Sequence, residues 1–491
     1  MMISMRPLLN RRLGYTFLGL VVIYVLIVDG YVRPQTKALT IEDFDYSDFG
    51  TTPLESTHGN GTRILLVSAM FPLSKSKHTT KDYADWLNRF LGPLTTDIYM
   101  YTTPDFAETL AEIRGSLPIT IDTSYSSPFL VPPLIGLEET YTKMNDMDKE
   151  KWHHSPGLYA IWNAKPYLLQ TAVRNLAEKK IYYDYAFWND GGSFRRNHIY
   201  ENWPDPGRIE QVWEEASTLT GKDKVDLLFF PIFQLPEEKL SDWIEEMGPI
   251  ANSVQFSEGS FFLSLPSIIQ PFYLITLYIG SFFGGSPSTV EWFASIFYAY
   301  HNHYIQQGLF VGIDQDVFNA LFLLFPERMF TVWMNDPLAP AHQGITPSPN
   351  IIPSLERGYL GECGAEWFYY QFWFADRATR DGMRKIWISE ERWRKWGWWQ
   401  ARKPCRLTRA ISMMDVLRRS FGDTWQPPTK KVVIPPSWPF PPHPRLPPSL
   451  MWLAFFQLKK KLEGYWVCDD VAIKLLVLVG GHRHFRWELW K

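Results

Sequence analysis

Asp184 to Arg196 reads DYAFWNDGGSFRR, and this stretch decides how the rest of the chain is interpreted. Tyr185 to Trp188 is a short apolar and aromatic run, which is typical of a buried strand. Asn189-Asp190-Gly191-Gly192 follows at once and consists of residues that favour tight turns. The segment therefore predicts a strand that runs into a turn, with a carboxylate at the carboxyl end of the strand.

Similar strands alternate with helices on both sides of this segment, which predicts an α/β fold with a mostly parallel sheet and helices on both faces. The expected strands are Ile64–Ala69, Ile98–Thr102, Ile119–Ile121, Tyr185–Trp188 and Val225–Phe230. The expected helices are Lys81–Leu91, Phe106–Arg114, one that begins at Pro166, one capped by Ser288 and one capped by Asp314.

Composition excludes several classes of protein. The 491 residues carry 49 Lys and Arg against 52 Asp and Glu, so the net charge is −3, which speaks against a dedicated nucleic-acid binder. Apolar residues at 46% exclude a largely disordered chain, and three cysteines exclude a disulfide scaffold. Aromatic residues make up 16%, and these can serve as core, membrane-interface belt or sugar-stacking platform.

The N-terminus predicts a membrane anchor. Leu13–Val28 has no charged residue, three arginines precede it and Asp29 follows it. The positive-inside rule then places residues 1–12 in the cytosol, a signal-anchor helix at 13–28 and a stalk at 29–62 in the lumen of the Golgi or ER. A cleaved signal peptide is the alternative. In a lumenal stalk, the sequon at Asn60 would be a glycosylation site.

The remaining chain divides into a domain at 63–426, a Pro-rich linker at 427–450 and a tail at 451–491. Gly259–Val290 carries no charge, so one interpretation is a second membrane span. The other starts from a direct repeat, because GSFF occurs at 259–262 and again at 280–283. Residues 263–283 are then a 21-residue insertion or retained intron. The tail is either a partner-binding segment or a mis-spliced gene end.

Asp190 is the residue with the clearest chemistry. It follows a strand, and in open α/β sheets ligands bind at the carboxyl edge. A carboxylate there can hold a divalent cation, and Arg195 and Arg196 supply donors suited to a diphosphate. The alternative is that the segment is only a turn.

Several motifs together resemble the HtrL/YibB (WlaTC/HtrL) glycosyltransferase-like family, in the fungal form with an N-terminal anchor. Leu65–Phe71 is similar to the opening strand of that family, and Lys165-Pro166-Tyr167-Leu168-Leu169 to its Lys-Pro helix start. Phe187-Trp188-Asn189-Asp190-Gly191-Gly192 is similar to its Trp-x-Asp-Ala/Gly-Gly signature. Gly284-Gly285 and Gly312-Ile313-Asp314-Gln315 resemble late elements of nucleotide-sugar transferases.

The resemblance implies a GT-A-like nucleotide-diphospho-sugar transferase fold and transfer of a sugar to a glycan, glycoprotein or glycolipid acceptor. It implies Asp190 and Asp314 as catalytic residues, with Asp190 also as the ligand of Mn²⁺ or Mg²⁺. The substrate-binding residues that it implies are Lys165, Trp188, Gly191, Gly192, Arg195, Gly284, Gly285 and Gln315. The usual Asp-x-Asp motif is reduced to one carboxylate, so dependence on a metal stays open.

Alternatives stay open for individual residues and for the whole chain. Asp314 is either an acid/base group or a plain helix cap, and Lys165 reaches a phosphate or lies on the solvated surface. Cys363 and Cys405 would pair in an oxidising lumen. The alternative function is that of a non-catalytic, membrane-anchored protein that retains a glycosyltransferase-like fold.

Overall fold

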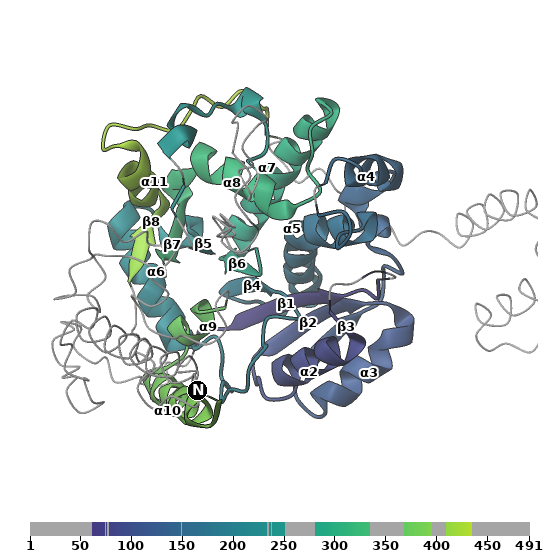
Figure 1. Cartoon of the computed structure of the whole chain (residues 1–491). Helices are drawn as coiled ribbons and strands as arrows, with labels where there is room; N and C mark the ends of the chain where they lie inside the picture. Colours follow the sequence, from purple (N-terminus) through teal and green to yellow (C-terminus); the bar gives the residue numbers. More distant parts are fainter. Residues whose placement is uncertain are drawn as a thin grey trace, which may run out of the picture. The chain divides into compact units, whose positions relative to one another are not determined.

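The computed structural model describes residues 61–434, except for 74, 76–77, 149, 233–234, 237, 251–279, 334–367 and 395–408 (Figure 1). Within these ranges eight strands form one sheet in the order β3-β2-β1-β4-β6-β5-β7-β8. The strands are β1 Ile64–Met70, β2 Asp97–Thr102, β3 Ile119–Asp122, β4 Tyr185–Asn189, β5 Leu228–Ile232, β6 Phe282–Gly285, β7 Met329–Trp333 and β8 Ala410–Ser412.

Most neighbouring strands in the sheet run parallel. β1 pairs in parallel with β2 and β4, β2 with β3, and β5 with β7. β6 lies antiparallel between β4 and β5, and β8 is antiparallel to β7. The predicted α/β class with a mostly parallel sheet is therefore confirmed, and β6 is a reversed strand in the middle of it.

Helices cover both faces of the sheet (Figure 1). They are α2 Thr80–Leu91, α3 Pro104–Arg114, α4 Glu138–Asn145, α5 Pro156–Glu178, α6 Pro206–Thr220, α7 Pro287–Gln306, α8 Asp314–Leu324, α9 Tyr370–Trp373, α10 Arg377–Arg394 and α11 Met413–Phe421. Short 3₁₀ turns lie at Pro128–Leu130, Pro132–Leu134, Lys224–Asp226, Glu238–Asp242, Glu245–Met247 and Pro326–Arg328.

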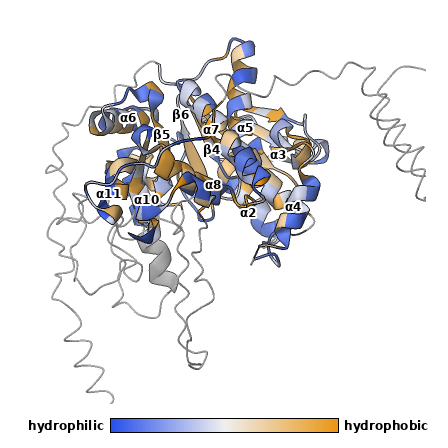
Figure 2. Ribbon diagram, turned by 90° about the horizontal axis from the view of Figure 1, so that it is seen from above, coloured by the Kyte–Doolittle hydropathy of each residue, from blue (hydrophilic) through white to orange (hydrophobic). Residues whose placement is uncertain are grey.

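The core has two halves because strand side chains alternate between the two faces. Leu65 and Val67 join the half covered by α5, α7 and α8, whereas Ile64 and Leu66 join the half covered by α2, α6 and α9. Hydrophobic residues, orange in Figure 2, concentrate on the central strands and on the inward sides of the helices. Much of the aromatic content is core: the ring of Phe187 on β4 stacks 5.1 Å from that of Phe282 on β6.

Several predicted boundaries were wrong. α5 begins at Pro156 with Ser155 as its cap, so Pro166 lies inside the helix rather than at its start. α7 is capped by Ser286 instead of Ser288, because Pro287 occupies the first helical position, where its missing N–H costs nothing. β5 begins at Leu228, three residues later than predicted, since Lys224–Asp226 form a 3₁₀ turn.

Within the ranges that the structure describes, no helix is long and apolar enough to cross a membrane. The predicted anchor at 13–28 lies outside those ranges, as do Asn60, Cys363, Cys405, residues 263–279 of the suggested insertion and residues 435–491.

Candidate functional site

Three charged side chains that are far apart in the sequence meet at the carboxyl edge of the sheet. Lys165 lies on α5, Asp190 follows β4, and Asp314 is the first residue of α8. The Lys165 ammonium is 3.2 Å from Asp190 Oδ1 and 3.0 Å from Asp314 Oδ2. It also donates to the backbone carbonyl of Gly280 over 2.9 Å. The triad of Lys165, Asp190 and Asp314 is thus a single cluster with one cation between two carboxylates.

Exposure differs across the triad. The side chains of Lys165 and Asp314 are 4% and 2% exposed, whereas that of Asp190 is 34% exposed. The interpretation of Lys165 as solvated surface was therefore wrong. Asp190 is the member that a ligand at the sheet edge would meet first, and Lys165 and Asp314 lie behind it.

The turn after β4 fixes the Asp190 carboxylate. The indole Nε1 of Trp188 donates to Asp190 Oδ1 over 2.6 Å, and the Asp190 N–H donates to the Ser281 carbonyl. Ser193 closes the turn, because its N–H donates to the Asp190 carbonyl and its hydroxyl to Asn189 Oδ1. Trp188 itself is 1% exposed, so its ring holds the carboxylate and presents no face to a ligand.

Burial and charge act in opposite directions on the pKa values of the triad. Burial lowers the pKa of Lys165, but the two carboxylates outweigh it and the pKa ends above its ordinary value. For Asp314, burial dominates over the ion pair with Lys165 and raises the pKa to about 6. Lys165 is therefore a charged ammonium at neutral pH, and Asp314 titrates closer to neutrality than an ordinary aspartate.

The backbone of α5 next to Lys165 is interrupted by Pro166 and supported by Tyr298. Pro166 has no N–H for the helical ladder, and the hydroxyl of Tyr298 on α7 inserts beside it. That hydroxyl accepts from the Tyr167 N–H and donates to the Asn163 carbonyl, over 3.2 and 2.8 Å. Tyr298 therefore satisfies backbone groups next to the proline and ties α5 to α7.

Asn163 places Asp314 from the same helix. Its side-chain amide donates to the carbonyls of Val311 and Gly312, three and two residues before Asp314, over 3.0 and 3.1 Å. Asn163 is fully buried, so these bonds are shielded from water. The Asp314 carboxylate does not cap α8 as a side chain at the N-cap would, because Ile313 holds that position. Its Oδ1 instead accepts from the N–H of Gln315.

The predicted glycines fall into two groups. A Cβ on Gly191 would lie 3.3 Å from Leu87 and 3.5 Å from the hydroxyl of Ser68 on β1, so Gly191 allows the turn to approach β1 closely. Gly284 and Gly285 lie inside β6, where a Cβ would meet the carbonyl oxygens of Ala186 and Leu227 at 2.1 and 2.5 Å. That second pair packs strand against strand and does not lie at the carboxyl edge.

Arg195 stands beside the triad on the exposed side. Its guanidinium lies over the rings of Trp86 and Phe368, 4.5 and 5.1 Å from their centroids, and its Nε donates to the Gly192 carbonyl. The residue is exposed overall. Aromatic faces on a guanidinium hold its plane while the terminal nitrogens stay able to donate.

Three further residues of the site, Gly280, Ser281 and Tyr370, were not predicted from the sequence. Gly280 and Ser281 give the triad its two backbone acceptors, and a Cβ on Gly280 would lie 3.3 Å from Asp314 Oδ2. The Ser281 hydroxyl lies 3.2 Å from that of Tyr370. The repeated GSFF was the available signal, since its second copy contains both residues of the site.

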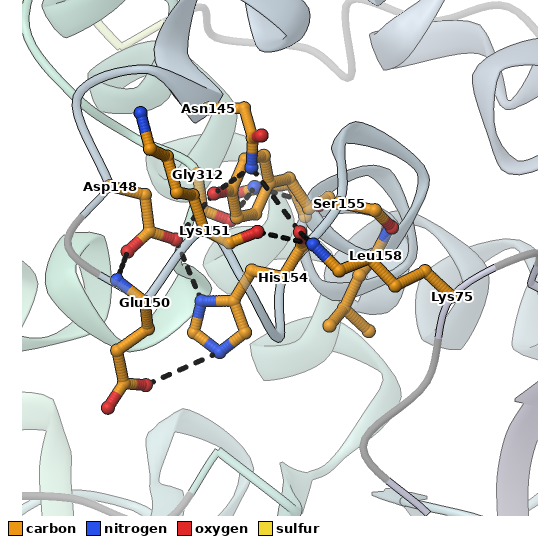
Figure 3. Close-up of polar contacts among 11 residues, drawn as sticks. Lys75, Asn145, Asp148, Glu150, Lys151, His154, Ser155, Leu158 and Gly312 are labelled. Carbon is orange, nitrogen blue, oxygen red and sulfur yellow. Dashed lines mark hydrogen bonds and ion pairs between the residues drawn. The ribbon is translucent and has the colours of Figure 1, made fainter.

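A second polar cluster, which the sequence did not predict, lies at the N-terminal end of α5 (Figure 3). The ring of His154 lies between two carboxylates, with Nδ1 2.7 Å from Asp148 and Nε2 3.5 Å from Glu150. Asp148 also accepts from the hydroxyl of Tyr159 over 2.5 Å. Burial alone would raise the pKa of Asp148, but these hydrogen bonds lower it. Lys75 donates to the His154 carbonyl, which ties the loop after β1 to the start of α5.

The triad does not fit the usual donor set of a divalent cation. Among the described residues, no group of three or more His, Cys, Asp and Glu side chains could hold a metal ion. Mn²⁺ and Mg²⁺ need several oxygen ligands, and here both carboxylates of the triad are already paired with the ammonium of Lys165.

No family model and no curated protein matches the sequence. Among solved structures the chain is similar to mouse xyloside xylosyltransferase 1 in its apo form, at 12% identity over 55% of this chain and 83% of that one, with a TM-score of 0.29. It is also similar to core-mannan synthase A from Aspergillus fumigatus in a Mn/GDP form, at 13% identity over 57% and 75%, with a TM-score of 0.31. A CMP:2-keto-3-deoxy-manno-octonic acid synthetase complexed with CTP matches at 7% identity over 50% and 87%, with a TM-score of 0.21.

Proposed function

We propose that the chain binds a nucleotide-sugar at the carboxyl edge of the sheet and transfers its sugar to a glycan, glycoprotein or glycolipid acceptor. The observation that carries the proposal is the position of the triad in the sheet. In chain order, β2 and β3 extend the sheet on one side of β1, and β4 then pairs with the other side of β1, so the strand order reverses between β1 and β4. Asp190 follows β4 directly and Gly191 lies against β1, which is where open α/β sheets bind their ligands.

The proposed roles follow from exposure. Asp190 contacts the donor because it is the exposed carboxylate of the triad. Arg195 pairs with the diphosphate, since its guanidinium is held flat at the same edge and is suited to bidentate contacts with phosphate. Lys165, Asp314 and Trp188 are positioning residues that hold Asp190, and Gln315 contributes its N–H to Asp314.

A buried hydroxyl adds to the proposal. Ser68 on β1 is wholly buried, and its Oγ has no hydrogen-bond partner within the described ranges. It lies 3.5 Å from the position of a Cβ on Gly191. A buried polar atom without a hydrogen-bond partner costs free energy. The unpaired Ser68 hydroxyl is therefore expected where a bound ligand can supply the partner.

The binding experiment uses the full chain in detergent with a panel of UDP- and GDP-sugars, measured by calorimetry. We expect at least one donor to bind, and Asp190→Asn and Arg195→Met each to weaken its binding by about tenfold or more. Asp223→Asn is the matched control, because Asp223 is an exposed carboxylate at the amino end of β5. Absence of binding to every donor in the panel contradicts the proposal.

The second candidate is a protein that retains the fold and binds the donor without turnover. It is favoured by the single exposed carboxylate of the triad, since the other is 2% exposed. Release of free nucleotide from the bound donor in the presence of mixed glycans separates the two. Turnover that Asp190→Asn lowers by about 100-fold supports transfer, and binding without turnover supports the second candidate.

We also propose, from the sequence motifs and the apolar stretch at 13–28, that the chain belongs to the HtrL/YibB group with a GT-A-like fold. The reversed strand in a parallel-rich sheet is compatible with that fold. The chain would be a single-pass type II protein of the Golgi or ER membrane. Protease treatment of sealed microsomes tests the topology: a C-terminal tag should be protected and an N-terminal tag removed.

A further inference from the structure

The Lys165 ammonium fills the position that a bridging cation would take at this site. It lies within 3.4 Å of both oxygens of Asp190 and 3.0 Å from Asp314 Oδ2. The ammonium also donates a hydrogen bond to the Gly280 carbonyl. Two carboxylates and a backbone carbonyl around one positive centre are the kind of oxygen environment that a hard divalent cation also selects.

The carboxylate oxygens that a metal ion would need also accept other hydrogen bonds. Asp190 Oδ1 accepts from the Trp188 indole in addition to its contact with Lys165, and Asp314 Oδ1 accepts from the Gln315 N–H. A divalent cation bound to Asp190 would also lie within a few ångströms of the ammonium, where like charges repel strongly in a partly buried site. Binding of the cation therefore requires Lys165 to leave its pocket, although its side chain is 4% exposed.

We propose that Lys165 serves as the built-in cation of this site and takes the place of a divalent metal ion. Its ammonium pairs with both Asp190 and Asp314, fixes the orientation of Asp190 and occupies the position that Mn²⁺ or Mg²⁺ would need. Lys165 is a positioning residue, because its donors point to protein oxygens rather than to the sheet edge. The positive charge that faces a diphosphate then comes from Arg195. This last role depends on the proposed function, whereas the exclusion of a metal ion by Lys165 is independent of it.

The test measures Mn²⁺ binding to the full chain by electron paramagnetic resonance, without any nucleotide. We compare the wild type with Asp190→Asn, Lys165→Met and Lys165→Met/Asp190→Asn. The wild type and Asp190→Asn should bind Mn²⁺ equally weakly. Lys165→Met should gain one site that binds at least tenfold more tightly, and the double variant should lose it, because that site needs the Asp190 carboxylate. Lys165→Arg keeps a cation and should gain no site.

Two results would overturn the proposal. One is stoichiometric Mn²⁺ binding by the wild type that Asp190→Asn abolishes, and this comparison is decisive even where Lys165→Met fails to fold. The other is a folded Lys165→Met variant, checked by circular dichroism, that gains no Mn²⁺ site. UDP and GDP binding with EDTA or with Mn²⁺ completes the test: equal affinities are expected, and a gain of tenfold with Mn²⁺ in the wild type contradicts the proposal. Failure of both nucleotides to bind counts against the proposed function alone.

Discussion

Asp314 lies directly behind Lys165, with its Oδ2 3.0 Å from the ammonium nitrogen and both side chains almost entirely buried. Removal of two charges from water is costly, and their attraction offsets that cost only while both partners are present. The pair connects α5 to the start of α8 and supports Asp190 from inside the protein. Stability and the geometry of the proposed site therefore depend on the same contact.

Asp314→Ala should destabilise the chain by about 3–5 kcal/mol, because it leaves the buried ammonium of Lys165 with Asp190 as its only carboxylate. The free energy of unfolding in urea measures the loss. Glu327→Ala is the control. The side chain of Glu327 is 36% exposed, and its ion pair with Lys430 should contribute less than about 1 kcal/mol to stability. Equal losses of unfolding free energy for the two substitutions would mean that the buried Asp314–Lys165 pair contributes no more to stability than an exposed ion pair.

Stability should depend on pH through Asp314. Its pKa is about 6 in the folded chain against an ordinary value of 3.8, so folding takes up a proton between these values. The contribution of this residue is fully present below pH 3.8 and is lost as the pH rises through 6, by about 3 kcal/mol in total. The pKa of Lys165 lies above its ordinary 10.5 and affects stability only in strongly alkaline solution.

Urea unfolding of the wild type and Asp314→Asn at pH 4, 5, 6 and 7 checks this dependence. The difference in unfolding free energy, wild type minus variant, should fall steadily over the series. Parallel pH profiles for the two proteins would show that Asp314 does not titrate in this range.

Tyr298→Phe should cost about 1–3 kcal/mol, because it removes one hydroxyl that serves two backbone groups of α5. The proline at 166 creates the need for that hydroxyl, so Pro166→Ala combined with Tyr298→Phe should cost less than the sum of the two single changes. Thermal and urea unfolding of the four proteins give the coupling free energy. Strict additivity would argue that the hydroxyl is unrelated to the helix distortion at Pro166.

The sheet could largely be predicted because its parallel strands are continuous apolar runs between turn residues. β4 is the clearest case, since all five of its residues are buried and a turn follows at once. β6 could not be predicted: Phe282–Gly285 has four residues, two of them glycines, and its place between β4 and β5 depends on pairing with chain segments about 55 and 100 residues away.

The members of the site could be named from the sequence, but not their arrangement. The sequence left open whether Lys165 reaches a phosphate or lies on the solvated surface, and it predicted a helix that begins only at Pro166. Once the helix is known to run from Pro156, Lys165 falls three, four and seven residues before Leu168, Leu169 and Ala172, which is the buried face. The ion pair with Asp314 spans about 150 residues, and local patterns contain no information on such a contact.

The direct repeat leads to a prediction about the 21 residues made up of one copy and the 17 residues between the copies. Removal of residues 263–283 and removal of residues 259–279 yield the same protein, because each leaves a single GSFF followed by Gly284 and Gly285. The structure builds β6 and the two backbone acceptors of the triad from GSFF and the glycine pair. The deletion therefore keeps every residue of 280–285 that contacts the triad or the neighbouring strands.

We expect the protein without residues 263–283 to fold with the same circular dichroism spectrum and a Tm at least equal to that of the full chain. A deletion of equal length at 266–286 is the matched control, because it removes Gly284 and Gly285 together with Ser286, the cap of α7. A side chain in place of Gly284 would meet the backbone of β4 at 2.1 Å, so this control should not form the central sheet. Loss of folding in both deletions would establish residues 263–283 as an integral part of the domain and contradict the insertion hypothesis.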